Sequence, residues 1–340
     1  MKTLLACILA LAPLAAGPVL AHDGHAHAPA ARPAKGAAAP APPEVFRNRW
    51  GANYFPNVEL KTHHGKTVRL YDDLLKGKTV AVNIIFTDCI DVCPLETAML
   101  VQLYRLLGDR VGRNIHFYSI SIDPERDTPE VLKAYAEKFG ADLPGWLFLT
   151  GKLEDIKLAT KKLGLVRATD KARRDGHTAI LMVGHEPTGQ WNRNSALDEP
   201  RFLASRIASL LGWRDVLPAQ SYTEARPLDF ETGQYVYQGR CSACHTIGQG
   251  DKVGPDLAGI TARRERSWLT RYIRVPDQVL AEGDPIATAL FKKYNAVRMP
   301  NLHLAPDDVA DVLTYIEKTS AAVAAQNARR HQHDHTGHKH

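Results

Sequence analysis

Cysteine is scarce in this sequence. The 340 residues include five cysteines, which are Cys7 near the start, the pair Cys89 and Cys93, and the pair Cys241 and Cys244. None is left over for a framework of structural disulfides. Each of the two later pairs therefore needs an explanation in its own local chemistry.

Strong charge and long apolar runs are lacking as well. The formal net charge of +6 is small for 340 residues, and no stripe of lysine and arginine interleaved with aromatic residues occurs in the folded parts. This excludes the usual signature of a nucleic-acid partner. The apolar run at residues 4–20 is interrupted by proline and glycine and is shorter than the roughly 20 residues of a membrane span.

Residues 1–21 predict an export signal instead. Lys2 precedes the apolar run, and Ala21 ends a stretch suited to cleavage. We therefore expect the mature chain in the periplasm. Membrane anchoring through an uncleaved signal is the alternative.

Composition divides the rest of the chain. A stretch rich in alanine, proline and histidine has too little to bury to offset its ordering entropy and predicts a tether. Alternating strand and helix patterns then predict an α/β domain, and a helical pattern after a proline-containing linker predicts an all-α domain. The expected segments are the tether 22–49, the α/β domain 50–213, the linker 214–227, the all-α domain 228–320 and a histidine-rich tail 321–340.

The sequence CSACH at residues 241–245 is a signature of covalent heme attachment, in which two cysteines bind the vinyl groups and the next histidine binds iron. The alternative is that the motif occurs by chance. The neighbouring sequence argues against this, because it contains an apolar helical lead-in, GPDLAG at residues 254–259 and RMPN at residues 298–301. With these motifs, residues 229–320 resemble class I cytochromes c. The resemblance implies heme c attached to Cys241 and Cys244, iron ligation by His245 and Met299, and a Pro255 carbonyl that accepts the His245 N–H.

Two points in this region stay open. Met299 could be an ordinary packing residue, with His303 as the alternative iron ligand. The last helix shows an apolar stripe from Val309 to Ile316 at i, i+3, i+4 and i+7 and is expected to pack across the first helix. Its start is weakly signalled, because Ala305 is a poor cap before Pro306.

The middle region places its cysteines at the end of a strand. The apolar run 80–86 predicts a buried strand, CIDVCP follows at residues 89–94, and an apolar helical pattern comes next. We expect Cys89 to gain thiolate character from the helix N-terminus. The other expected features are a hairpin around Gly65, strands at 115–122, 146–149 and 179–183, and a helix capped by Thr128 and stopped by Gly140.

The CxxxCP turn, DPERDTP at residues 123–129 and DGHT at residues 175–178 resemble the SCO/SenC family of thioredoxin-like copper proteins across this domain. The resemblance implies three copper ligands, Cys89, Cys93 and His177. The chain departs from many members at Ile90, where they have proline, which affects loop stiffness more than the ligands. Two thiolates and an imidazole suit Cu(I) and can also hold Cu(II). A metal-free redox dithiol and a zinc site with the same ligands are the alternatives.

The other histidines carry weaker signals. Those in the body of the domain lack a motif and are expected to be structural. Those of the two ends, from His22 and from His331 onward, either capture divalent ions or only keep the ends soluble. The histidines expected to be structural are His63, His64, His116 and His185.

A Met/His heme has a raised potential. If it lay near 0 mV, reducing a disulfide of about −180 mV would be uphill by roughly 8 kcal/mol, so the heme is not expected to reduce the disulfide. The favourable directions are oxidation of the dithiol by the heme and one-electron exchange between heme iron and copper, and the second is the expected purpose of the fusion. By resemblance, the chain is a metallochaperone for the dinuclear copper centre of a heme-copper oxidase. Its expected partners are the copper-bearing subunit of cytochrome c oxidase and other periplasmic redox proteins. The alternatives are a thiol-disulfide oxidoreductase, which would be an enzyme, and an electron carrier with a docking domain.

Overall fold

The structure is a computed structural model that describes residues 50–166, 179–216 and 231–336, with side chains up to residue 329. The expected signal 1–21 and tether 22–49 lie outside the described residues. So do His177 and most of the expected linker.

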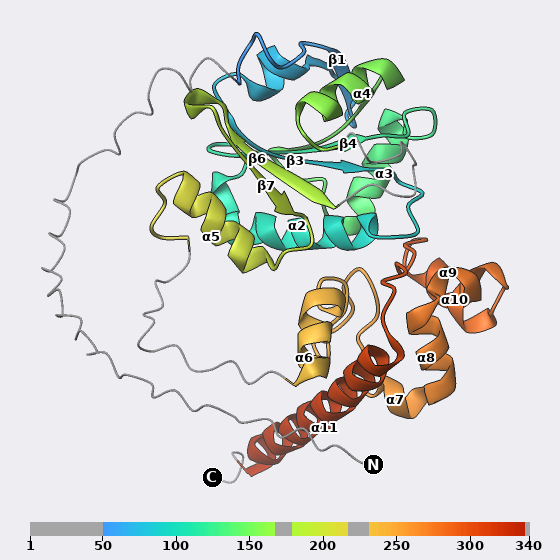
Figure 1. Ribbon diagram of the computed structural model, residues 1–340. Coiled ribbons are helices and arrows are strands. Elements are labelled where there is room, and N and C mark those ends of the chain that lie inside the picture. Colours follow the sequence, from blue (N-terminus) through green and yellow to red (C-terminus); the bar gives the residue numbers. More distant parts are fainter. Residues whose placement is uncertain (1–49, 167–178, 217–230, 337–340) are drawn as a thin grey trace, which may run out of the picture. The chain divides into compact units, whose positions relative to one another are not determined.

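A mixed seven-stranded sheet forms the first domain, in the order β2-β1-β5-β4-β3-β6-β7 (Figure 1). The neighbours β3, β4 and β5 run parallel, and the other pairs are antiparallel. The expected hairpin around Gly65 is confirmed as the pair β1 and β2. The strands are β1 (Glu59–Thr62), β2 (Thr67–Arg69), β3 (Thr79–Ile85), β4 (His116–Ser121), β5 (Trp146–Gly151), β6 (Ile180–His185) and β7 (Gln190–Ser195).

Helices cover both faces of this sheet. All residues of β3 are buried, as expected of a parallel strand with helices on either side. Helices α2, α3 and α5 share a hydrophobic core with one face, and α4 with the short helical segment η1 shares a core with the other. The helical elements are η1 (Leu70–Leu75), α2 (Cys93–Leu107), η2 (Gly108–Arg110), α3 (Pro129–Phe139), α4 (Leu153–Lys162), η4 (Glu186–Thr188) and α5 (Pro200–Leu210).

Helix α3 begins and ends as the sequence predicts. The Thr128 side chain accepts a hydrogen bond from the Val131 N–H, and Gly140 ends the helix with φ 63°. A parallel β3-α2-β4 unit followed by the antiparallel β6 and β7 is thioredoxin-like. The predicted fold, an α/β thioredoxin-like domain followed by an all-α cytochrome c domain, is confirmed.

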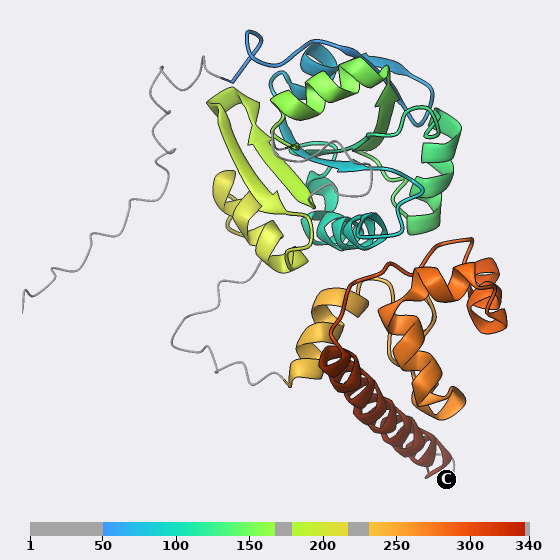
Figure 2. The same cartoon turned by 45° about the vertical axis from the view of Figure 1, so that its right-hand side comes forward.

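The second domain is built from helices alone in the described residues. Helix α11 crosses α6, and the expected stripe from Val309 to Ile316 is buried (Figure 2). A Cβ at Gly233 would lie 2.1 Å from the Asp311 carbonyl oxygen, so this crossing requires glycine. The elements are α6 (Thr232–Val236), η5 (Tyr237–Cys241), α7 (Ile260–Arg263), α8 (Arg266–Arg274), α9 (Pro276–Ala281), α10 (Pro285–Lys293) and α11 (Pro306–Thr336).

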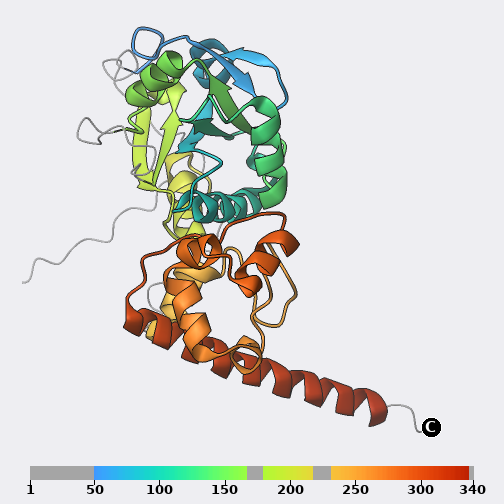
Figure 3. The same ribbon diagram turned by 90° about the vertical axis from the view of Figure 1, so that its right-hand side faces the viewer.

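Helix α11 begins at Pro306, at the weakly signalled start, and ends later than expected. The weak cap at Ala305 is compensated by Asp308, whose carboxylate accepts a hydrogen bond from the Ala305 N–H at 3.3 Å. The helix continues past residue 320 to Thr336 (Figure 3). Alanines follow Ser320, and their high helix propensity lets the helix extend although most of residues 321–329 are exposed.

The described residues all belong to one compact unit that spans residues 42–340. Within the described ranges, no helix combines the length and the apolar character that crossing a membrane requires.

Candidate metal centres

Cys89 and Cys93 lie on the turn that joins β3 to α2. The Cys89 N–H donates to the Phe86 carbonyl at 3.3 Å, and Cys93 is the first residue of α2. Cys89 is 3% exposed and Cys93 is fully buried. The side chains pack with Phe86, and a hydrogen bond joins the two thiols. The structure thus brings together two of the three predicted copper ligands.

The start of helix α2 separates the surroundings of the two thiols. Helix α2 begins at Cys93, four residues after Cys89, so Cys89 lies on the turn before the helix as expected. The expected stabilisation of a Cys89 thiolate by the helix N-terminus stays a prediction. Burial raises the pKa of Cys93 well above its ordinary value, and the hydrogen bond with Cys89 and the charge of Glu96 raise it further. At neutral pH Cys93 is therefore a protonated thiol, which must lose its proton before it binds a metal.

A polar shell around Cys93 was missed by the sequence analysis. Glu96 is 1% exposed and lies one helical turn after Cys93. The Cys93 carbonyl accepts hydrogen bonds from Thr97 Oγ1 at 2.9 Å and from Tyr135 Oη at 3.3 Å. A carboxylate inside the apolar stripe of a helix is the signal that could have revealed Glu96.

Asp127, from the DPERDTP segment, braces the turn before Cys89. Its carboxylate accepts hydrogen bonds from the Thr87 N–H, the Thr87 hydroxyl and the Ser121 hydroxyl at 3.1, 2.5 and 2.5 Å. Burial raises the pKa of Asp127, while these hydrogen bonds oppose the rise. The carboxylate thereby ties the end of β4 to the turn that carries the cysteines. His177, the third predicted ligand, lies outside the described residues and stays a prediction.

His245 is held for metal binding by its backbone partner. Its Nδ1 lies 2.9 Å from the Pro255 carbonyl, which only accepts hydrogen bonds, so Nδ1 carries the proton. Burial lowers the pKa of His245 and keeps the ring neutral. The Nε2 lone pair is then available to iron. A Cβ at Gly254 would lie 2.6 Å from His245 Cε1, so only glycine allows this approach.

A cavity of about 340 Å³ adjoins His245. Cys241 and Cys244 lie on its wall, Met299 lines it as well, and most of the remaining lining is apolar. This combination of two thiols, an imidazole, a thioether and an apolar interior fits a covalently attached heme. The apolar lining includes Leu257, Leu269, Leu290, Phe291, Leu313 and Ile316.

The two candidates for the second iron ligand lie in different surroundings. Met299 lines the cavity, and His303 is not among its lining residues. The His303 side chain is 73% exposed, and its Nε2 lies 3.1 Å from Asp91 Oδ1. This placement favours Met299.

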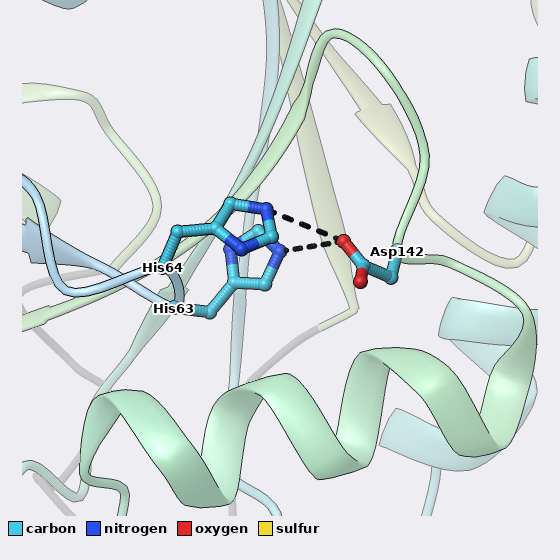
Figure 4. Close-up of side chains that lie close together, drawn as sticks. All are labelled: His63, His64 and Asp142. Atoms are coloured by element: carbon cyan, nitrogen blue, oxygen red, sulfur yellow. Dashed lines mark hydrogen bonds and ion pairs between the residues drawn. The ribbon is translucent and has the colours of Figure 1, made fainter.

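A third cluster joins His63, His64 and Asp142, and both rings point toward the carboxylate (Figure 4). The Nε2 atoms of His63 and His64 lie 3.1 and 3.3 Å from Asp142 Oδ1. The Phe148 N–H donates to His63 Nδ1, so a neutral His63 carries its proton on Nε2, where a metal would bind. The cluster is therefore better described as a hydrogen-bonded link between the end of β1 and the loop before β5 than as a metal site.

Family models match both domains. The SCO1/SenC model matches residues 49–211, and the Cytochrome c model matches residues 230–320. The first region belongs to the SCO1/SenC family and the second to the cytochrome c family. Membership of the cytochrome c family implies heme as the cofactor of the second region.

Individual relatives match the SCO1/SenC region. The SCO1 protein homolog of Bacillus subtilis is 37% identical over 129 residues, which cover 37% of this chain and 65% of that protein. Protein sco1 of Schizosaccharomyces pombe is 34% identical over 112 residues, which cover 33% of this chain and 41% of that protein. The chain thus spans less than two thirds of the length of these relatives.

Solved structures match the same region. The crystal structure of a SCO1/SenC family lipoprotein from Bacillus anthracis is 26% identical with a TM-score of 0.40, and the match covers 48% of this chain and 98% of that one. The structure of Bradyrhizobium japonicum ScoI with copper bound is 26% identical with a TM-score of 0.37, and the match covers 44% of this chain and 95% of that one.

Proposed function

We propose that this protein is an exported copper chaperone that binds copper through Cys89, Cys93 and His177. It acts in the periplasm and delivers copper to the dinuclear centre in the copper-bearing subunit of a heme-copper oxidase. The cytochrome c region, with His245 and Met299 as iron ligands, exchanges electrons. The function remains that of a metallochaperone and electron-transfer protein rather than of an enzyme.

One observation carries the proposal, which is the pair of buried, hydrogen-bonded thiols at the turn after β3 in an SCO1/SenC region. Two soft sulfur ligands in an apolar pocket favour Cu(I) over harder cations. Burial also limits the access of dioxygen, which would otherwise oxidise bound Cu(I).

A metal titration tests this proposal. Covalent heme counts the chains by its absorbance, so metal analysis gives copper per heme directly. We expect one copper per heme in the wild type and none in a variant with Cys89→Ser and Cys93→Ser. Equal copper in both proteins would reject the site, and preferential binding of zinc would reject the assignment of the metal.

The hydrogen-bonded thiols also favour a second candidate, a thiol-disulfide oxidoreductase acting on oxidase or other periplasmic cysteines. Reduction of a disulfide peptide by the metal-free protein, lost in the same double variant, would support it. An electron carrier with a docking SCO1/SenC region is the third candidate. Electron transfer to an oxidase without copper binding would support that one.

A further inference from the structure

A contact joins the two candidate centres. We call residues 88–93 the cysteine loop and residues 297–304 the methionine loop. The Asn301 N–H of the methionine loop donates to the Ile90 carbonyl of the cysteine loop at 3.1 Å. Both loops carry predicted metal ligands, so the contact brings the supports of the two centres together.

Two polar side-chain pairs flank this hydrogen bond. His303 Nε2 lies 3.1 Å from Asp91 Oδ1, and an Arg298 guanidinium nitrogen lies 3.7 Å from Asp88 Oδ1. These side chains are largely exposed, so each pair alone contributes little to stability. Together they fix how the two loops align, because Asp88 and Asp91 of the cysteine loop each face a basic side chain of the methionine loop.

The methionine loop is held in an unusual backbone conformation. His303 has φ 49°, and only two other described non-glycine residues, Asn295 and Ala296, have positive φ. Asn301 fixes the loop from within, because its side chain accepts from the His303 N–H at 3.1 Å and donates to Asp277 at 2.9 Å. Strained positions persist where surrounding contacts determine them, commonly at functional sites.

The cysteine loop also reaches the wall of the heme cavity. Pro94, the residue after Cys93, lines the cavity that Cys244 and Met299 line. Ile90 lines a small adjoining cavity together with Met299. Residues next to both cysteines therefore line the same cavities as Met299, the predicted iron ligand.

We infer that the methionine loop is a docking surface for the cysteine loop and that one electron passes through this contact. The inference rests on the proposed function. The step is Fe(III) + Cu(I) → Fe(II) + Cu(II), in which copper loses one electron and iron gains it, with no proton or bond transferred. A dithiol that closes to a disulfide releases two electrons, which a single heme does not accept, so the copper couple matches the heme's capacity.

The test uses the full-length holoprotein with oxidised heme, mixed with one equivalent of a Cu(I) complex. Heme reduction is followed by absorbance, and its intramolecular phase is independent of protein concentration. We expect this phase to slow at least tenfold when Arg298→Glu and His303→Asn are combined. Asparagine keeps a residue type that tolerates positive φ at position 303, and neither change touches a cysteine.

Hydrogen exchange gives a second measurement that does not depend on copper. The Asn301 amide should be protected in the wild type and exchange at least tenfold faster in the double variant. The matched control is Arg271→Glu, which makes the same change in charge at an exposed residue paired with Glu282. It should leave both measurements unchanged. Combining Asp88→Arg with Arg298→Glu should restore much of the protection.

The results separate the contact from the copper site. An unprotected Asn301 amide in the wild type, or a double variant that reduces heme as fast as the wild type, would overturn the inference. If the wild type binds no copper, the proposed function and the electron step both fail, and Asn301 protection alone decides the docking contact.

Discussion

The two regions differ in what fills their interiors. In the SCO1/SenC region, helices close both faces of the sheet, and Cys89 and Cys93 are buried among side chains of the chain itself. In the cytochrome c region, small clusters of buried residues surround a cavity of about 340 Å³. The SCO1/SenC region is therefore packed without a cofactor, whereas the cytochrome c region leaves a space that heme would fill.

The largest expected effect comes from removing heme attachment with Cys241→Ala and Cys244→Ala. Without heme, the cavity of about 340 Å³ is left unfilled and its apolar lining loses packing partners, which should cost more than the roughly 2–5 kcal/mol of truncating one core side chain. We expect the cytochrome c region to lose its helices in circular dichroism and to become sensitive to protease.

The control for that comparison is Cys89→Ala with Cys93→Ala, which removes the copper thiols. It should leave protease resistance unchanged in both regions. Equal resistance of the two double variants would contradict the view that heme alone completes a core.

The next effect concerns the crossing of α6 and α11. Gly233→Ala places a methyl group 2.1 Å from the Asp311 carbonyl oxygen, and overpacking of this kind costs about 3 kcal/mol. Urea unfolding monitored by the heme band should show the loss. The matched control is Gly239→Ala, whose added Cβ meets nothing within 4 Å, and which should be neutral or stabilising. A similar loss in both variants would indicate a general effect of helical alanine.

The pH dependence of copper binding gives the third effect. The pKa of Cys93 is raised by burial, so the thiol of the metal-free protein is protonated at neutral pH. Copper binding must therefore displace this proton. Below that raised pKa, affinity should fall about tenfold for each pH unit lowered per proton released. Calorimetry in buffers of different ionisation enthalpy measures the released protons. Binding without proton release would show that Cys93 is already a thiolate.

The smallest effect concerns Asp256, which belongs to the GPDLAG segment at residues 254–259 and lines the predicted heme cavity. Its carboxylate accepts hydrogen bonds from the Gly248, Gly250 and Ala258 amides, which hold its pKa at about 2. A lowered carboxyl pKa gives stability that is present above the ordinary pKa and is lost as the pH falls from about 4 toward 2. Allowing for solvent screening, we expect about 1 kcal/mol.

Acid unfolding of the wild type and of Asp256→Ala measures this contribution. The variant should be less stable above pH 4 and should lose the corresponding part of the pH dependence. Parallel stability curves for the two proteins would contradict the assignment to Asp256.

Features that depend on neighbours in sequence were predicted from the sequence alone. The cap at Thr128, the stop at Gly140 and the buried stripe of the last helix follow from local hydrogen bonds and helical periodicity. The CSACH motif needs only five consecutive residues. The two domains and their order followed from the same local patterns.

Features that depend on distant residues needed the tertiary structure. His63 and Asp142 are separated by 79 residues, and Asp91 and His303 by 212. The burial of Glu96 beside Cys93 was equally hidden. Local periodicity decides which face of a helix or strand is apolar. Which charged group packs near that face, and how strongly it raises the pKa of a thiol there, depends on residues that only the packed chain brings together.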